Sequence, residues 1–253
     1  MEQEELKDLL EELHERYNRV DFIACDPISV PHSFSRKEDI EIAGFFAAIM
    51  AWGQRSQIIK NANLLMDLMD RAPFDFVHNA SKKDLSRLDS FYYRTLKSVD
   101  VCFFIEVLKR LYRQSSLEIL FSDSYKRTGD LKDGLITLHS YFLGCEHQQR
   151  SMKHIANAEK GSSAKRLNMF LRWMIRSDIR GVDFGIWENI PASALYIPLD
   201  VHSGRVARDL EILKRKHNDW KAVVELTSNL RLFDPADPVK YDFALFGFGI
   251  DSK

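Results

Sequence analysis

The sequence predicts an all-α protein, and three observations lead to that fold class. Apolar residues recur three and four positions apart in most segments, and no segment shows a sustained alternation of apolar and polar residues. The chain has 253 residues but only 11 glycines and 7 prolines, too few for a fold built on tight β-turns. A hydrophobic content of 45% is enough to form a substantial core.

The same spacing predicts the individual helices in chain order. Residues 2–20 form an amphipathic helix with an acidic outer face. Ser35 stands three residues before Glu38, the spacing of a capping box, and predicts the start of the next helix. Residues 40–52 are apolar almost all round, which predicts the central buried helix. Further helices are predicted at residues 56–70, 99–112, 131–143, 164–176, 201–213, 220–233 and 238–248.

Charge is distributed unevenly along a chain whose net charge is only −1. Residues 1–41 hold twelve acidic and five basic residues, whereas residues 150–216 hold thirteen basic and seven acidic residues. This asymmetry permits a polyanion to bind one region, although an ordinary solvated surface explains it equally well.

Three cysteines lie far apart and form no C-x-x-C pair, so neither a zinc site nor an iron–sulfur cluster is expected, and no cofactor is implied. The N-terminus lacks the pattern of a signal peptide, and no apolar run reaches the roughly 20 residues needed to span a bilayer. We therefore expect a soluble, cytoplasmic monomer without a membrane partner.

The segment Gly161-Ser162-Ser163-Ala164-Lys165 departs from plain helical packing. Glycine and small hydroxyl residues at a helix start leave backbone N–H groups for a phosphate. Lys165 lies in the first turn, where the helix dipole disfavours a protonated amine and so favours a nucleophile. An ordinary helix start with a solvent-facing lysine remains the alternative.

A second unusual segment runs from Pro198 through Asp200 and His202 to Arg205. Asp200 is predicted at the N-cap of a helix, where the dipole keeps the carboxylate ionised and able to accept a proton or face a developing cation. A purely structural cap explains the same residue. For His202, a capping or packing role is expected rather than catalysis.

A third polar break, Gln54-Arg55, follows the most apolar helix, and Gln54 could present its amide to a base edge or a phosphate. Gly161 stands four residues before Lys165, and the chain also holds the Asp-x-His segment and this glutamine. In these features the chain resembles the helix–hairpin–helix (HhH-GPD) DNA glycosylase superfamily. Residues 165–176, 197–210 and 237–249 are similar to a family of uncharacterised conserved bacterial proteins of unknown function.

The superfamily resemblance implies two helical subdomains with a cleft between them: residues 38–185, and residues 1–37 plus 186–253. It implies Lys165 and Asp200 as catalytic residues of a DNA-repair glycosylase, with abasic lyase activity as an option, acting on double-stranded DNA with a damaged base. The implied DNA-binding residues are Gln54, Arg55, Gly161, Ser162, Ser163, Arg166, Arg172, His202 and Arg205.

Two features depart from the superfamily pattern. The hairpin lacks its second glycine, and Lys165 and Asp200 lie 35 residues apart, roughly double the common separation. Archaeal 8-oxoguanine DNA glycosylases have a similarly long insertion, which makes 8-oxoguanine one candidate lesion. A catalytically inactive DNA-binding protein of the same fold, and a helical protein unrelated to DNA, remain open as alternatives.

Overall fold

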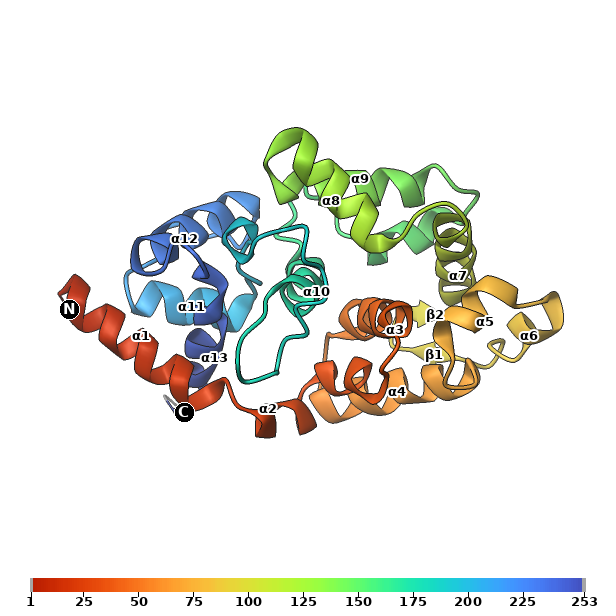
Figure 1. Cartoon of the computed structure of the whole chain (residues 1–253), viewed down its shortest axis with the longest axis horizontal. Coiled ribbons are helices and arrows are strands. Elements are labelled where there is room, and N and C mark those ends of the chain that lie inside the picture. Colours follow the sequence, from red (N-terminus) through yellow and green to blue (C-terminus); the bar gives the residue numbers. More distant parts are fainter. Residues whose placement is uncertain (1, 252–253) are drawn as a thin grey trace. The chain divides into compact units, whose positions relative to one another are not determined.

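The computed structural model describes residues 2–251, and backbone only for residues 250 and 251. The described chain is helical over 65% of its length, with 2% in strands, which confirms the all-α class (Figure 1). It forms two compact units. Unit 1 comprises the residues up to Ala24 together with those from Asn157 onward, and unit 2 comprises Cys25–Ala156.

The unit boundaries differ from the sequence-based division at residues 37/38 and 185/186. Helix α10 (Lys165–Ile175) lies on the same side of the boundary as the C-terminal helix α13 (Tyr241–Asp251). The buried side chain of Arg172 in α10 pairs with Asp242 in α13, so these two helices share one core.

Unit 2 contains seven α-helices, three 3-10 turns and one hairpin within its described residues. In chain order they are η1 (Pro27–Ser29), η2 (Pro31–Ser33), α3 (Lys37–Met50), α4 (Arg55–Leu68), α5 (Pro73–Asn79), α6 (Lys82–Ser86), β1 (Tyr92–Tyr93), β2 (Leu96–Lys97), α7 (Ser98–Tyr112), α8 (Leu117–Thr128), α9 (Leu131–Leu143) and η3 (Gln149–His154).

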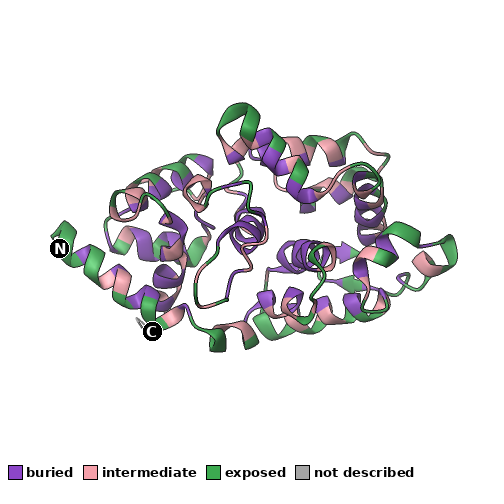
Figure 2. Ribbon diagram, viewed as in Figure 1, coloured by how far each residue is buried: buried purple, intermediate pink, exposed green. Residues whose placement is uncertain are grey.

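Helix α3 is the buried centre of unit 2, as its composition predicts (Figure 2). Every residue from Ile40 to Met50 is buried. The rings of Phe45 and Phe104 meet edge to face at 6.2 Å, and Phe142 of α9 lies 5.8 Å from Phe45. Aromatic pairs of this kind add to the free energy of burial.

The predicted capping box at Ser35 is wrong. The N-cap of α3 is Arg36, and no side chain caps this end of the helix. Arg36 instead pairs with Glu38 and Asp75. Glu38 is thereby engaged with a neighbouring side chain rather than with the backbone N–H at the helix start.

A short antiparallel hairpin, β1–β2, interrupts the helices of unit 2. Tyr92 pairs with Lys97 and Tyr93 with Leu96. Each strand has two residues, too few for an alternating pattern to appear in the sequence.

Unit 1 is built from six α-helices and two 3-10 turns in its described part. They are α1 (Gln3–Tyr17), α2 (Val20–Ala24), α10, η4 (Ala192–Ala194), α11 (Val201–Asp209), α12 (Trp220–Phe233), η5 (Pro238–Lys240) and α13. Helix α11 ends earlier than the predicted 201–213, because Glu211 has a left-handed backbone (φ 59°) that a continuing helix does not allow.

Helix α1 packs along α13, so the N-terminal segment completes a core formed by the C-terminal third (Figure 1). The approach is close at Gly247, where a Cβ atom would lie only 2.0 Å from the ring of Tyr17. No helix in the described residues is long and apolar enough to cross a membrane.

Candidate functional site: a lysine and two aspartates in unit 1

The turn that precedes α10 is held by hydrogen bonds within its own loop. Gly161 has a left-handed backbone (φ 88°), and its amide donates to the carbonyl of Ala158. The amide of Ser162 donates to Asn157, and the amide of Ala164 donates to Oγ of Ser162. The amides of Gly161, Ser162 and Ala164, which were expected to be open to a phosphate, therefore already have partners within the loop.

Lys165 is the first residue of α10. Its predecessor, Ala164, is buried and has a left-handed backbone (φ 48°), a conformation that costs an alanine about 1 kcal/mol. This turn is anchored to the start of α12, because the amide of Trp220 donates to the carbonyl of Gly161 at 2.9 Å. The position of Lys165 is thus set by a constrained turn and not by a side-chain cap.

Asp200 is the N-cap of α11, as the sequence predicts. Its Oδ1 accepts the amides of His202 at 2.8 Å and Ser203 at 3.0 Å. Asn218 donates to the backbone carbonyl of Asp200 at 2.8 Å, which holds the residue from a second side. One carboxylate oxygen is used for capping, and Oδ2 remains for another partner.

That partner is Lys165. Its Nζ lies 3.8 Å from Oδ2 of Asp200, although the two residues are 35 positions apart in the chain. The side chains are 27% and 38% exposed, respectively, so a ligand can reach both. Nζ also contacts Sδ of Met169, at 3.8 Å.

Asp242 is a third member of this site that sequence reasoning missed. Its pKa rises to about 6 because burial of the carboxyl outweighs the attraction of Arg172. Lys165 and Asp200 also interact electrostatically with Asp242, Lys165 lowering its pKa and Asp200 raising it. The sequence offers no signal for this residue, since an aspartate at the start of a C-terminal helix is an ordinary feature.

Arg172 and Arg176 lie behind the site in a buried network of charges. Arg172 is 4% exposed and pairs with Asp183 and with Asp242. Arg176 pairs with Asp183 at 3.1 Å and with Asp237 at 2.8 Å. The prediction that Arg172 contacts DNA is therefore not retained, because its guanidinium is buried and bound to two carboxylates.

The remaining predicted site residues of unit 1 lie near the surface to different degrees. Ser162, His202 and Arg205 are exposed, whereas Gly161, Ser163 and Arg166 are half-buried. Burial lowers the pKa of Arg166.

Gln54 and Arg55 lie in unit 2, at the start of α4, and both are exposed. By contrast, two large aromatic residues of unit 1 are core residues. Phe170 and Trp187 are fully buried, with their rings edge to face at 5.5 Å.

Comparison with known proteins identifies one relationship. Residues 26–251 match the family described as "Protein of unknown function (DUF2400)". Neither the comparison with curated proteins nor that with solved structures found a match. Because the family match extends over most of the sequence, the chain belongs to the DUF2400 family.

Proposed function

We propose that this protein is a DNA-repair glycosylase that uses Lys165 as its nucleophile and Asp200 as the carboxylate that assists it. The observation that carries the proposal is the distance of 3.8 Å between Lys165 Nζ and Asp200 Oδ2 at a partly exposed surface. A lysine amine beside a carboxylate can lose its proton to that carboxylate and then attack a carbon centre.

The proposed reaction begins with transfer of a proton from the Lys165 ammonium group to Asp200. The Nζ lone pair forms a bond to C1′ of the deoxyribose, and the electron pair of the glycosidic bond leaves with the base, which takes up a proton. The departing base takes this proton from Asp200, which is thereby ionised again and stabilises the positive charge that develops on the sugar before the new bond is complete.

A lyase step follows from the covalent intermediate. Breaking the C1′–O4′ bond opens the sugar ring and converts the amine adduct into a protonated Schiff base. Removal of a C2′ proton by a carboxylate then expels the 3′ phosphate oxygen by β-elimination. Hydrolysis of the Schiff base returns Lys165 to its free form.

Sequence features support DNA as the substrate. The excess of basic residues between 150 and 216 includes the exposed Arg205 and Lys160, which can pair with phosphates. The four-residue spacing from Gly161 to Lys165 is similar to that of the helix–hairpin–helix glycosylases, and the longer gap from Lys165 to Asp200 is similar to that of the archaeal 8-oxoguanine branch. Extrusion of the damaged base into a pocket would follow from that resemblance.

Borohydride trapping tests the proposal directly. Duplexes carrying 8-oxoguanine, other damaged bases or an abasic site are incubated with the protein and sodium borohydride, which reduces a Schiff base to a stable amine. We expect a covalent protein–DNA adduct on at least one substrate, and peptide mapping should place it at Lys165.

Two lysine variants complete this experiment. Lys165→Ala should abolish the adduct, whereas the exposed Lys160→Ala in the same loop should leave it unchanged. An adduct that persists in Lys165→Ala would refute the nucleophile assignment. Salt-dependent duplex binding without any adduct or base release would favour a non-catalytic DNA-binding protein.

A further inference from the structure

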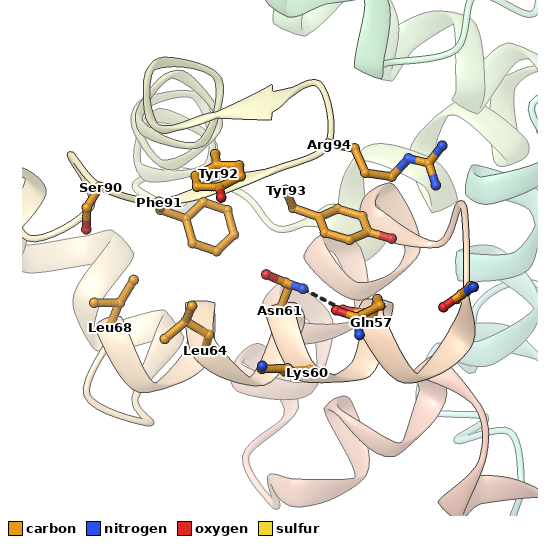
Figure 3. Close-up of a pocket in the computed structure, with 11 residues that line it drawn as sticks. Gln57, Lys60, Asn61, Leu64, Leu68, Ser90, Phe91, Tyr92, Tyr93 and Arg94 are labelled. Atoms are coloured by element: carbon orange, nitrogen blue, oxygen red, sulfur yellow. Dashed lines mark hydrogen bonds between the residues drawn. The ribbon is translucent and has the colours of Figure 1, made fainter.

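A groove of about 700 Å³ lies on unit 2, whereas Lys165 and Asp200 belong to unit 1. It runs between helix α4 and the β1–β2 hairpin (Figure 3). Its lining residues are Gln54, Gln57, Lys60, Asn61, Leu64, Leu68, Ser90, Phe91, Tyr92, Tyr93 and Arg94.

The groove carries positive charge without a counterbalancing acid. Lys60 and Arg94 are both exposed, and none of the described residues that line the groove is acidic. The guanidinium of Arg94 lies 4.3 Å from the ring centre of Trp52, which fixes the cation at one end. Gly53 permits this approach, because a Cβ at that position would lie 2.5 Å from Nη1 of Arg94. A groove of this charge is complementary to an anionic ligand.

Apolar and aromatic surface accompanies these cations. Tyr92 is 72% exposed and Leu64 is 46% exposed. Figure 3 shows Phe91 directed from the hairpin toward Leu64 on α4. The neighbouring Tyr93 is held in place, since its hydroxyl donates to the carbonyl of Trp52 at 2.8 Å. An exposed ring on a rigid support is a surface on which a planar base can stack.

Amide side chains line the same groove along α4. Gln54, Gln57 and Asn61 follow one another along one face of α4, and amides can hydrogen-bond to base edges. From Gln54 to Leu68 the helix rises by about 21 Å. A groove of that length offers contacts to several consecutive units of a chain and not to one small anion alone.

We propose that this groove binds a single strand of DNA, with a base stacked on Tyr92 and phosphates paired with Lys60 and Arg94. The choice of DNA over RNA rests on the proposed function, whereas binding of a strand follows from the groove itself. Stacking and phosphate pairing together hold a strand with little dependence on its sequence.

The test measures binding of a fluorescein-labelled oligothymidylate to the full chain by fluorescence anisotropy. Tyr92→Ala should weaken binding by at least about fivefold, because a stacked base is lost, and Tyr92→Phe should restore it. Lys60→Gln should weaken binding and lower the slope of log K against log salt by about one, whereas the exposed Lys83→Gln on the same unit should not.

Other outcomes would overturn the proposal. No binding of the strand by the wild-type chain, or equal binding by Tyr92→Ala and Lys60→Gln, contradicts a strand-binding groove. Full competition by thymidine monophosphate at equal nucleotide concentration would identify a mononucleotide site instead. Much tighter binding of oligouridylate would contradict DNA as the ligand.

The Lys165→Ala variant separates this inference from the proposed reaction. It should bind the oligothymidylate like the wild type while forming no borohydride adduct. If Lys165→Ala loses the adduct but still binds the strand, Lys165 is needed for the reaction and not for strand binding. Loss of strand binding in the groove variants tests the groove independently of the reaction.

Discussion

Asp200 performs two tasks with its two carboxylate oxygens: Oδ1 caps helix α11, and Oδ2 lies 3.8 Å from the amine of Lys165. The capping bonds orient the carboxylate, so the lysine meets an acceptor whose position is already set. The arrangement explains why a residue that resembles an ordinary helix cap in the sequence can also belong to a reactive site.

Substitution of Asp200 should separate these two tasks. Asp200→Asn retains an oxygen for the cap and removes the charge, so we expect unchanged thermal stability and loss of borohydride trapping. Asp200→Ala removes both and should also lower the free energy of unfolding by about 1 kcal/mol. Trapping at the wild-type level in Asp200→Asn would show that the carboxylate charge is dispensable.

Titration of Asp242 should lower the stability of the folded protein as the pH rises. Burial raises its pKa from 3.8 to about 6, so the folded state binds this proton more tightly than the unfolded state does. Its contribution to stability is therefore greatest below pH 4 and decreases as the pH rises toward 6, by at most about 3 kcal/mol.

The Asp242→Asn variant lacks this titration and supplies the comparison. The stability of the variant relative to the wild type should increase between about pH 4.5 and pH 7, as measured by urea unfolding at each pH. A difference between the two proteins that does not change with pH would contradict the raised pKa.

Arg176 should matter far more to stability than a partly exposed arginine of the same unit. It is 1% exposed and binds Asp183 and Asp237, so Arg176→Ala leaves Asp237 without this partner and Asp183 with Arg172 alone, and should cost about 3–5 kcal/mol. Arg180 is 26% exposed and pairs with the exposed Glu15, and Arg180→Ala should cost no more than about 1 kcal/mol. Equal losses in chemical denaturation would argue against a buried network.

Close packing of α1 on α13 predicts a further stability change. Gly247→Ala places a methyl group against the ring of Tyr17 and should destabilise the protein by about 1–3 kcal/mol. Adding Tyr17→Ala should recover part of that loss, which is a non-additive double-mutant cycle. The control is Gly144→Ala, whose Cβ would meet nothing nearer than 3.4 Å. If the effects of Gly247→Ala and Tyr17→Ala on the free energy of unfolding are simply additive, the two positions are not in contact.

Much of the local structure could be predicted from the sequence, because it depends on residues close together in the chain. The predicted helices 131–143 and 220–233 match α9 and α12. The cap at Asp200 and the helix start at Lys165 follow from neighbours within a few positions. The failures were also local in origin: Ser35 has the right spacing for a cap, but Arg36 takes that position.

Long-range contacts decided the rest. Only the folded chain brings Asp242 into electrostatic contact with Lys165 and Asp200, and only packing shows that Arg172 is buried. The groove on unit 2 likewise joins α4 to a hairpin too short to be recognised by its pattern.

By itself, then, the sequence determined the helical class, most helix positions and the candidate pair of Lys165 and Asp200, since helical periodicity and capping are properties of neighbouring residues. The tertiary structure alone decided which charges are buried, which meet across the chain and which stay exposed to a ligand. Those properties depend on desolvation and on distances between residues far apart in sequence, which no local pattern encodes.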